Sequence, residues 1–194
     1  MKVFGKSKKT VIPVSRTLPT LEDNYTILWV GTGEAYVYEN DGYVRSESND
    51  YAFEVIQRRH GNNWKSIKNQ HRIHPDYNGK AGPREQTMYF DIEFSQADGT
   101  LKSVLKSSLG DGSGISDKEF REQTLQFQAA GISAFAPYNQ YRITQHYQYE
   151  EGLLIETVEL FKLKEGAEKP FAKIEERATI FRPTKLEGAP TRFV

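Results

Sequence analysis

The stretch QYRITQHYQY at residues 140–149 indicates the fold class. Its odd positions carry Tyr141, Ile143 and Tyr147, whereas the even positions between them are polar. Successive side chains of a β-strand point to opposite faces, so this alternation predicts a strand with one apolar and one polar face. The segment MYFDIEF at residues 88–94 alternates in the same way, with its apolar residues at even positions. Both segments predict strands of an antiparallel sheet.

Tight turn signals separate the other strand-like segments. They are Asn40-Asp41-Gly42, Gly61-Asn62-Asn63, Asp98-Gly99 and Glu151-Gly152, and Gly and Asn tolerate the positive φ that hairpins need. We therefore expect strands over residues 25–30, 34–39, 43–46, 51–58, 64–73, 86–95, 100–107, 140–150, 153–164 and 172–182. Strands in this order predict a mainly β protein, an antiparallel meander closed into a single β-barrel; the alternative is a two-sheet β-sandwich.

One segment predicts a helix inside this barrel. Ser116-Asp117-Lys118-Glu119 has the Ser-x-x-Glu form of a capping box, and Gly131 stands where a helix commonly ends. We therefore expect a helix over residues 116–130. A strand is the competing interpretation, because residues 124–128 also alternate. The glycine-rich run at residues 110–114 is expected to be a connecting loop.

The strand count, the short hairpins and the single internal helix resemble a calycin or lipocalin-like barrel in outline. The Gly-x-Trp signature of that family is absent, since Trp29 is followed by Gly31 and Gly33 instead of being preceded by a glycine. The resemblance therefore implies an architecture and assigns no site residue.

Composition limits the partners and the location of the protein. Of 194 residues, 26 are Lys or Arg and 26 are Asp or Glu, so no net field attracts nucleic acid or an anionic membrane. No apolar stretch follows the basic N-terminus, as a secretory signal would require. We expect one domain over residues 1–194 with flexible ends at about 1–9 and 185–194. A cytoplasmic location is expected, although a removed signal peptide would leave the same sequence.

Metal and cofactor motifs are weak. The chain has no cysteine, and His71 and His74 would point to opposite faces of a strand. Residues 111–122 begin with an acid and end with a glutamate like a calcium loop, but they carry Ile115 and Ser116 where that loop needs an oxygen ligand and a glycine. We expect no bound metal and no cofactor.

The aromatic residues of the strands suggest a ligand site. A polar strand face is either the solvated outside of the sheet or the lining of a barrel. In the second case we expect a binding site lined by five residues, namely Trp64, Tyr89, Arg142, His146 and Tyr147.

Three functions follow from these expectations. The first is a small-molecule binding protein that holds a partly apolar or aromatic ligand in or at the mouth of the barrel. The second is an enzyme of the hydrolase or isomerase type that uses the same cavity, with His146 as general base and Arg142 as anion clamp. The third is an interaction module that pairs through a sheet face, a possible homodimer.

Overall fold

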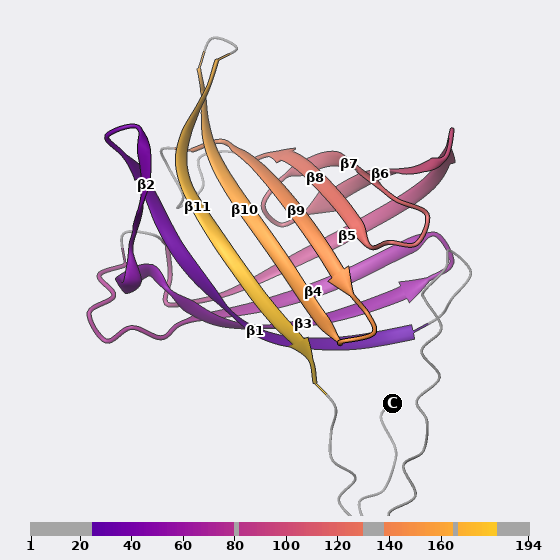
Figure 1. Cartoon of the computed structure of the whole chain (residues 1–194), viewed down its shortest axis with the longest axis horizontal. Coiled ribbons are helices and arrows are strands. Elements are labelled where there is room, and N and C mark those ends of the chain that lie inside the picture. The colour runs from indigo at the N-terminus through magenta and orange to yellow at the C-terminus, as the bar shows by residue number, and fades with distance from the viewer. Residues whose placement is uncertain (1–24, 80–81, 130–137, 165–166, 182–194) are drawn as a thin grey trace, which may run out of the picture.

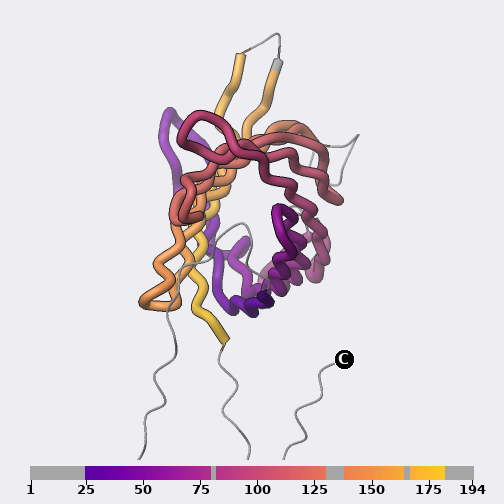
Figure 2. The backbone as a smooth tube through the Cα atoms, turned by 90° about the vertical axis from the view of Figure 1, so that its right-hand side faces the viewer, coloured from indigo at the N-terminus to yellow at the C-terminus, as the bar shows by residue number. Residues whose placement is uncertain are grey.

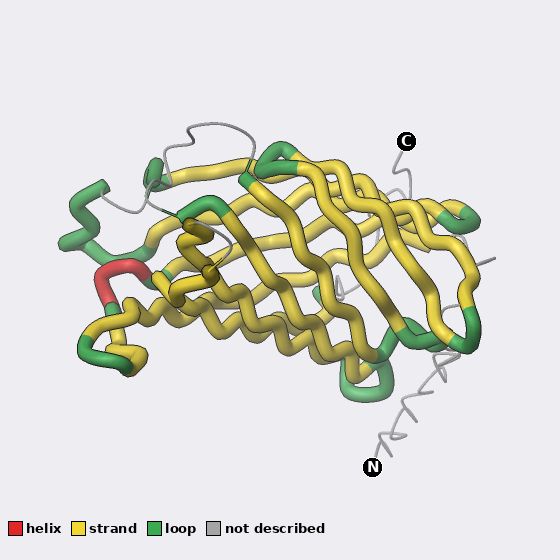
Figure 3. Tube along the Cα trace, turned by 90° about the horizontal axis from the view of Figure 1, so that it is seen from above, coloured by secondary structure: helices red, strands yellow, loops and turns green. Residues whose placement is uncertain are grey.

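The computed structural model describes residues 25–79, 82–129, 138–164 and 167–181. Strands make up most of this part of the chain, and the one short helix in it is a 3-10 turn at Glu47–Asn49 (Figure 3). The expected flexible ends lie outside the described residues. The strands are β1 (Tyr25–Glu39), β2 (Gly42–Arg45), β3 (Tyr51–His60), β4 (Asn63–Arg72), β5 (Glu85–Ala97), β6 (Thr100–Ser107), β7 (Asp111–Ser116), β8 (Glu122–Gln128), β9 (Gln140–Gln148), β10 (Leu153–Lys164) and β11 (Ala167–Ile180).

The strands form a closed antiparallel barrel. Each pairs with its neighbour in the chain, except that β3 pairs with β1, and β11 returns to pair with β1 (Figure 1). Figure 2 shows the resulting ring of strands. Ten strands make the ring, and β2 is an extra strand on the projecting end of β1. The predicted barrel is confirmed, with more strands than the eight of a lipocalin barrel. No helix in the described part is long and apolar enough to cross a membrane.

Two expected strands are in fact the single strand β1, which runs through Gly31 and Gly33 without a break. A Cβ atom at Gly31 would lie 2.3 Å from the carbonyl oxygen of Arg177 on β11. A glycine within a strand often marks such a close approach of another backbone. The glycines of β1 therefore mark the seam where the ring closes and do not end a strand.

The predicted helix over residues 116–130 is wrong. Its described part forms the end of β7, a turn and β8, and the glycine-rich run expected to be a loop forms most of β7. Gly112 and Gly114 have no room for side chains, since their Cβ atoms would lie 2.1 and 2.4 Å from carbonyl oxygens of β8. Tertiary contacts thus override the capping signal, and the competing strand interpretation holds for β8.

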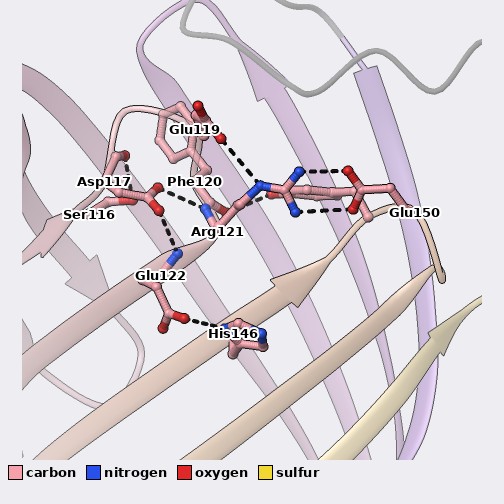
Figure 4. Close-up of polar contacts among 9 residues, drawn as sticks. Ser116, Asp117, Glu119, Phe120, Arg121, Glu122, His146 and Glu150 are labelled. Atoms are coloured by element: carbon pink, nitrogen blue, oxygen red, sulfur yellow. Dashed lines mark hydrogen bonds and ion pairs between the residues drawn. The ribbon is translucent and has the colours of Figure 1, made fainter.

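Asp117 organises the turn that replaces the helix start (Figure 4). Its two carboxylate oxygens accept hydrogen bonds from the backbone N–H groups of Arg121, at 2.8 Å, and Glu122, at 3.2 Å. The Arg121 guanidinium also forms a two-pronged ion pair with Glu150. Phe120, which lies between Asp117 and Arg121 in this turn, adopts a positive φ of 53° and is completely buried.

Phe120 closes one end of the barrel. Its ring meets Trp64 and Phe94 edge-on, with centroids 5.2 and 4.9 Å away. The buried guanidinium of Arg59 lies over its face at 4.1 Å, in the arrangement that favours a cation on an aromatic ring. This aromatic cluster fills the end of the barrel that contains the turn between β7 and β8.

Candidate functional site: a polar stripe inside the barrel

A row of polar residues crosses the inner wall from strand to strand. We call Tyr51, Glu176, Glu156, Gln145 and Gln123 the polar stripe. Glu176 on β11 pairs with Glu156 on β10, Glu156 with Gln145 on β9, and Gln145 with Gln123 on β8. Neighbouring strands lie about 4.8 Å apart, so these four positions span about 14 Å of the wall.

Gly33 continues the stripe to β3. It pairs with Glu176 on one side and with Tyr51 on the other. A Cβ atom at Gly33 would lie 2.6 Å from the Tyr51 ring. Because glycine leaves this space open, the phenol lies over β1 and donates a hydrogen bond to Glu176.

Apolar side chains flank the stripe. Ile174, Val158, Ile143 and Leu125 form the next inward row on the same four strands. The row after that includes Tyr141 and Phe127, whose rings stack with centroids 4.6 Å apart. The inner wall therefore offers a polar band beside a broad apolar surface.

The stripe and this apolar surface line a cavity of about 380 Å³. This volume is within the range of small-molecule sites. The lining continues to Asn49, Asn78 and Tyr138, which lie in segments next to β3, β4 and β9. Tyr138 comes just before β9 and so lies at one end of the barrel. Tyr149 comes just after β9 and lies at the other end, where it donates a hydrogen bond to the Phe120 carbonyl. The cavity thus extends toward the end of the barrel opposite the Phe120 cluster.

Lys68 reaches the stripe from the opposite wall. It projects inward from β4, and its Nζ lies 2.5 Å from a Glu176 oxygen and 3.2 Å from a Glu156 oxygen. Gln145 also donates to Glu156. Removing two carboxylates and an ammonium group from water is costly, and such ions are tolerated when they are paired and hydrogen-bonded. Lys68, Glu156 and Glu176 thus form a buried ion network at the cavity wall.

Burial and mutual interaction shift the pKa values of this network. Burial, reinforced by the negative charge of Glu156, raises the pKa of Glu176 to about 7, although Lys68 and Tyr51 oppose the shift. Burial would also raise the pKa of Glu156, but Lys68 and the Gln145 hydrogen bond together lower it. Burial acts to lower the pKa of Lys68, but the two glutamates outweigh it and raise that pKa. Glu176 is therefore the member of the network that titrates near neutral pH.

A chain of hydrogen bonds joins the stripe to the aromatic end. The Trp29 indole N–H donates to the Gln57 oxygen at 3.2 Å, and the Gln57 amide donates to the Tyr147 hydroxyl at 3.3 Å. Tyr147 in turn donates to the Gln145 oxygen at 3.1 Å. Trp29, Gln57 and Tyr147 are buried, and each of their polar atoms in this chain has a partner, as buried polar groups normally do.

Gln123 is the exception in the stripe. Its side chain is buried, with 2% of the residue exposed, and it belongs to the cavity lining. Neither its amide nitrogen nor its amide oxygen has a hydrogen-bond partner among the residues that the structure describes. Such an unsatisfied buried group costs about 1–3 kcal/mol.

The structure brings together two of the five predicted site residues. Tyr147 lines the cavity, and the Trp64 ring stacks against it with centroids 5.8 Å apart. Tyr89, Arg142 and His146 lie on the outer surface instead. Tyr89 is 56% exposed, since the inward residues of β5 are at even positions.

Arg142 and His146 face outward because the odd positions of β9 face the interior. Arg142 pairs with Glu168 at 3.0 Å, and His146 pairs with Glu122 on β8 (Figure 4). The polar face of this strand is therefore the solvated side of the sheet. Arg142 and His146 therefore do not form an acid–base site inside the barrel.

The most important interior residues, Lys68 and Glu156, were not among the predicted site residues. Lys68 gave no signal, because both faces of β4 carry polar residues. Glu156 did give one, since it falls in phase with Leu154, Val158 and Leu160 in an otherwise apolar series. A charge in such a series indicates a buried, paired ion.

Metal ligands do not gather in the described part of the chain, where no three His, Asp or Glu side chains lie close enough together to hold an ion. The expected absence of a metal stays a prediction. Comparisons with protein-family models, with curated proteins and with solved structures find no match.

Proposed function

We propose that this protein binds a small, partly apolar molecule inside the barrel. The molecule enters from the end opposite Phe120 and lies against the polar stripe and the apolar rows beside it. The single observation that carries this proposal is the cavity of about 380 Å³ with its divided lining. Small-molecule sites combine a mainly apolar wall with a few placed polar groups in the same way.

Tyr147 and Trp29 also support this function, because both line the cavity and each is held by a buried hydrogen bond. Fixed aromatic rings lose little freedom when a ligand packs against them. Pairing of two copies through a sheet face stays a prediction beside this one.

A neutral fluorescent probe tests the proposal. N-phenyl-1-naphthylamine brightens in an apolar site and accepts excitation energy from nearby tryptophans, and Trp29 lines the cavity. We expect saturable brightening with energy transfer. Ala172→Phe places a ring into the cavity lining and should weaken binding by about tenfold, a loss of about 1.4 kcal/mol.

Ala52→Phe is the matched control, because Ala52 alternates with the inward residues Tyr51 and Phe53 and so faces outward. It should leave probe binding unchanged. Absence of saturable binding to the wild type would refute the proposal, and so would equal effects of the two substitutions in folded proteins.

A further inference from the structure

Gln123 lacks hydrogen-bond partners in a place where a bound molecule can supply them. It is buried in the wall of the cavity, and both of its amide atoms lack partners among the described residues. Its neighbour in the stripe, Gln145, has its amide committed to Glu156 and Tyr147. Of these two glutamines, Gln123 is the one with an uncommitted donor and acceptor.

The shape of a primary amide limits what can satisfy both atoms at once. It presents an N–H donor and a carbonyl acceptor side by side, as when Gln or Asn binds the adjacent donor and acceptor of adenine. The complement is a rigid group with a carbonyl oxygen next to an N–H, as in a lactam or a cyclic imide.

The charges around Gln123 favour a neutral group. Glu156 and Glu176 share the single ammonium of Lys68, and protonation of Glu176, whose pKa is raised by burial, leaves the network with no net charge. A ligand with its own charge would have to disturb this buried pairing, which is costly.

We propose that the ligand of this cavity is a neutral, largely apolar ring system with a lactam-type edge, and that Gln123 binds that edge. This inference rests on the proposed function, since it names the chemistry of the molecule in the same cavity. The adjacent row with Ile143 and Leu125 receives the apolar part.

Two probes that differ in one hydrogen-bond donor test this inference. 2-Quinolinone has the lactam edge, whereas N-methyl-2-quinolinone has the same rings with the N–H blocked. We expect wild-type protein to bind 2-quinolinone at least about tenfold more tightly, measured by displacement of N-phenyl-1-naphthylamine. A site built to hydrogen-bond a ligand strongly rejects an analogue without the group, because the buried partner is then left unpaired.

Gln123→Leu should abolish this preference while the naphthylamine still binds, which also shows that the variant is folded. Gln126→Leu is the matched control, since Gln126 lies on the same strand with its side chain on the exposed face. It should keep the full preference.

The outcomes separate the two proposals. If the naphthylamine binds but wild-type protein shows no preference between the quinolinones, or binds neither, the lactam inference is overturned, because Gln123 then does not recognise a lactam edge. If the naphthylamine itself does not bind, the cavity proposal fails. The wild-type comparison needs no variant, so the inference can be refuted even if Gln123→Leu folds poorly.

Discussion

Lys68→Met removes the positive member of the buried ion network. In the wild type, the Lys68 ammonium lies within 3.2 Å of both Glu156 and Glu176. Methionine fills similar space but leaves two carboxylates together in a buried site. Breaking a buried ion pair from one side costs about 3–5 kcal/mol, and each kcal/mol lowers the Tm of a protein of this size by about 2–4 °C. We expect a Tm loss of roughly 10 °C at pH 8.

The loss should be smaller at pH 5. Without Lys68, burial and mutual repulsion raise the pKa values of the glutamates further. A carboxyl whose pKa is higher in the folded chain binds more protons there, so stability is highest in acid and falls as the pH rises through the folded pKa.

Thermal and urea unfolding at pH 5 and pH 8 measure both effects. Lys65→Met on the outer face of β4 is the control, because Lys65 is 65% exposed and its pair with Asp91 is a surface contact. Its effect should stay within about 1 kcal/mol. A Lys68→Met variant as stable as this control at pH 8 would show that Lys68 does not hold the two glutamates in a buried ion network.

Three further substitutions test other features. The wild-type free energy of unfolding, measured by urea titration, should fall as the pH rises from about 4.5 to about 7, because folding raises the pKa of Glu176 across that window. Glu176→Gln should flatten this pH dependence, whereas the outer-face control Glu175→Gln should keep it. Phe120→Ala should cost about 3–5 kcal/mol, and an unchanged Tm would rule out Phe120 as the residue that closes the barrel end. Gly31→Ala should destabilise the fold by about 1–3 kcal/mol, because an added Cβ has no room there. Gly42→Ala is the control, since its Cβ would enter open space, and an equal loss from both variants would mean that the seam is not tightly packed.

Local alternation was sufficient to predict most of the barrel wall. Residues 88–94 and 140–149 showed which side chains share a face, and the hairpin turns gave the order of the strands. Alternation could not show that residues 110–114 form a strand, because a run of glycines has the composition of a linker. Only the close backbone of β8 explains why Gly112 and Gly114 are there.

The candidate site was harder to predict for a related reason. Tyr147 was found because an aromatic residue on an alternating strand is a good candidate for the interior. Arg142 and His146 were chosen for their chemistry, although the same alternation places them opposite Tyr147. Lys68 and Glu176 lie far apart in the sequence and meet across the barrel, so their pairing follows from ring closure and not from any local pattern.

Ring closure also has a consequence for how the protein is made. The seam pairs Trp29 with Ile180 and Val37 with Ala172, so it joins the first described strand to the last. Contacts of such long sequence separation form slowly, because a large loop must be closed before they contribute. During synthesis, β1 emerges early. The edge of β1 that later pairs with β11 stays unpaired until nearly the whole described chain has been made. An unpaired strand edge readily recruits other chains, so this interval is when the protein is most exposed to aggregation.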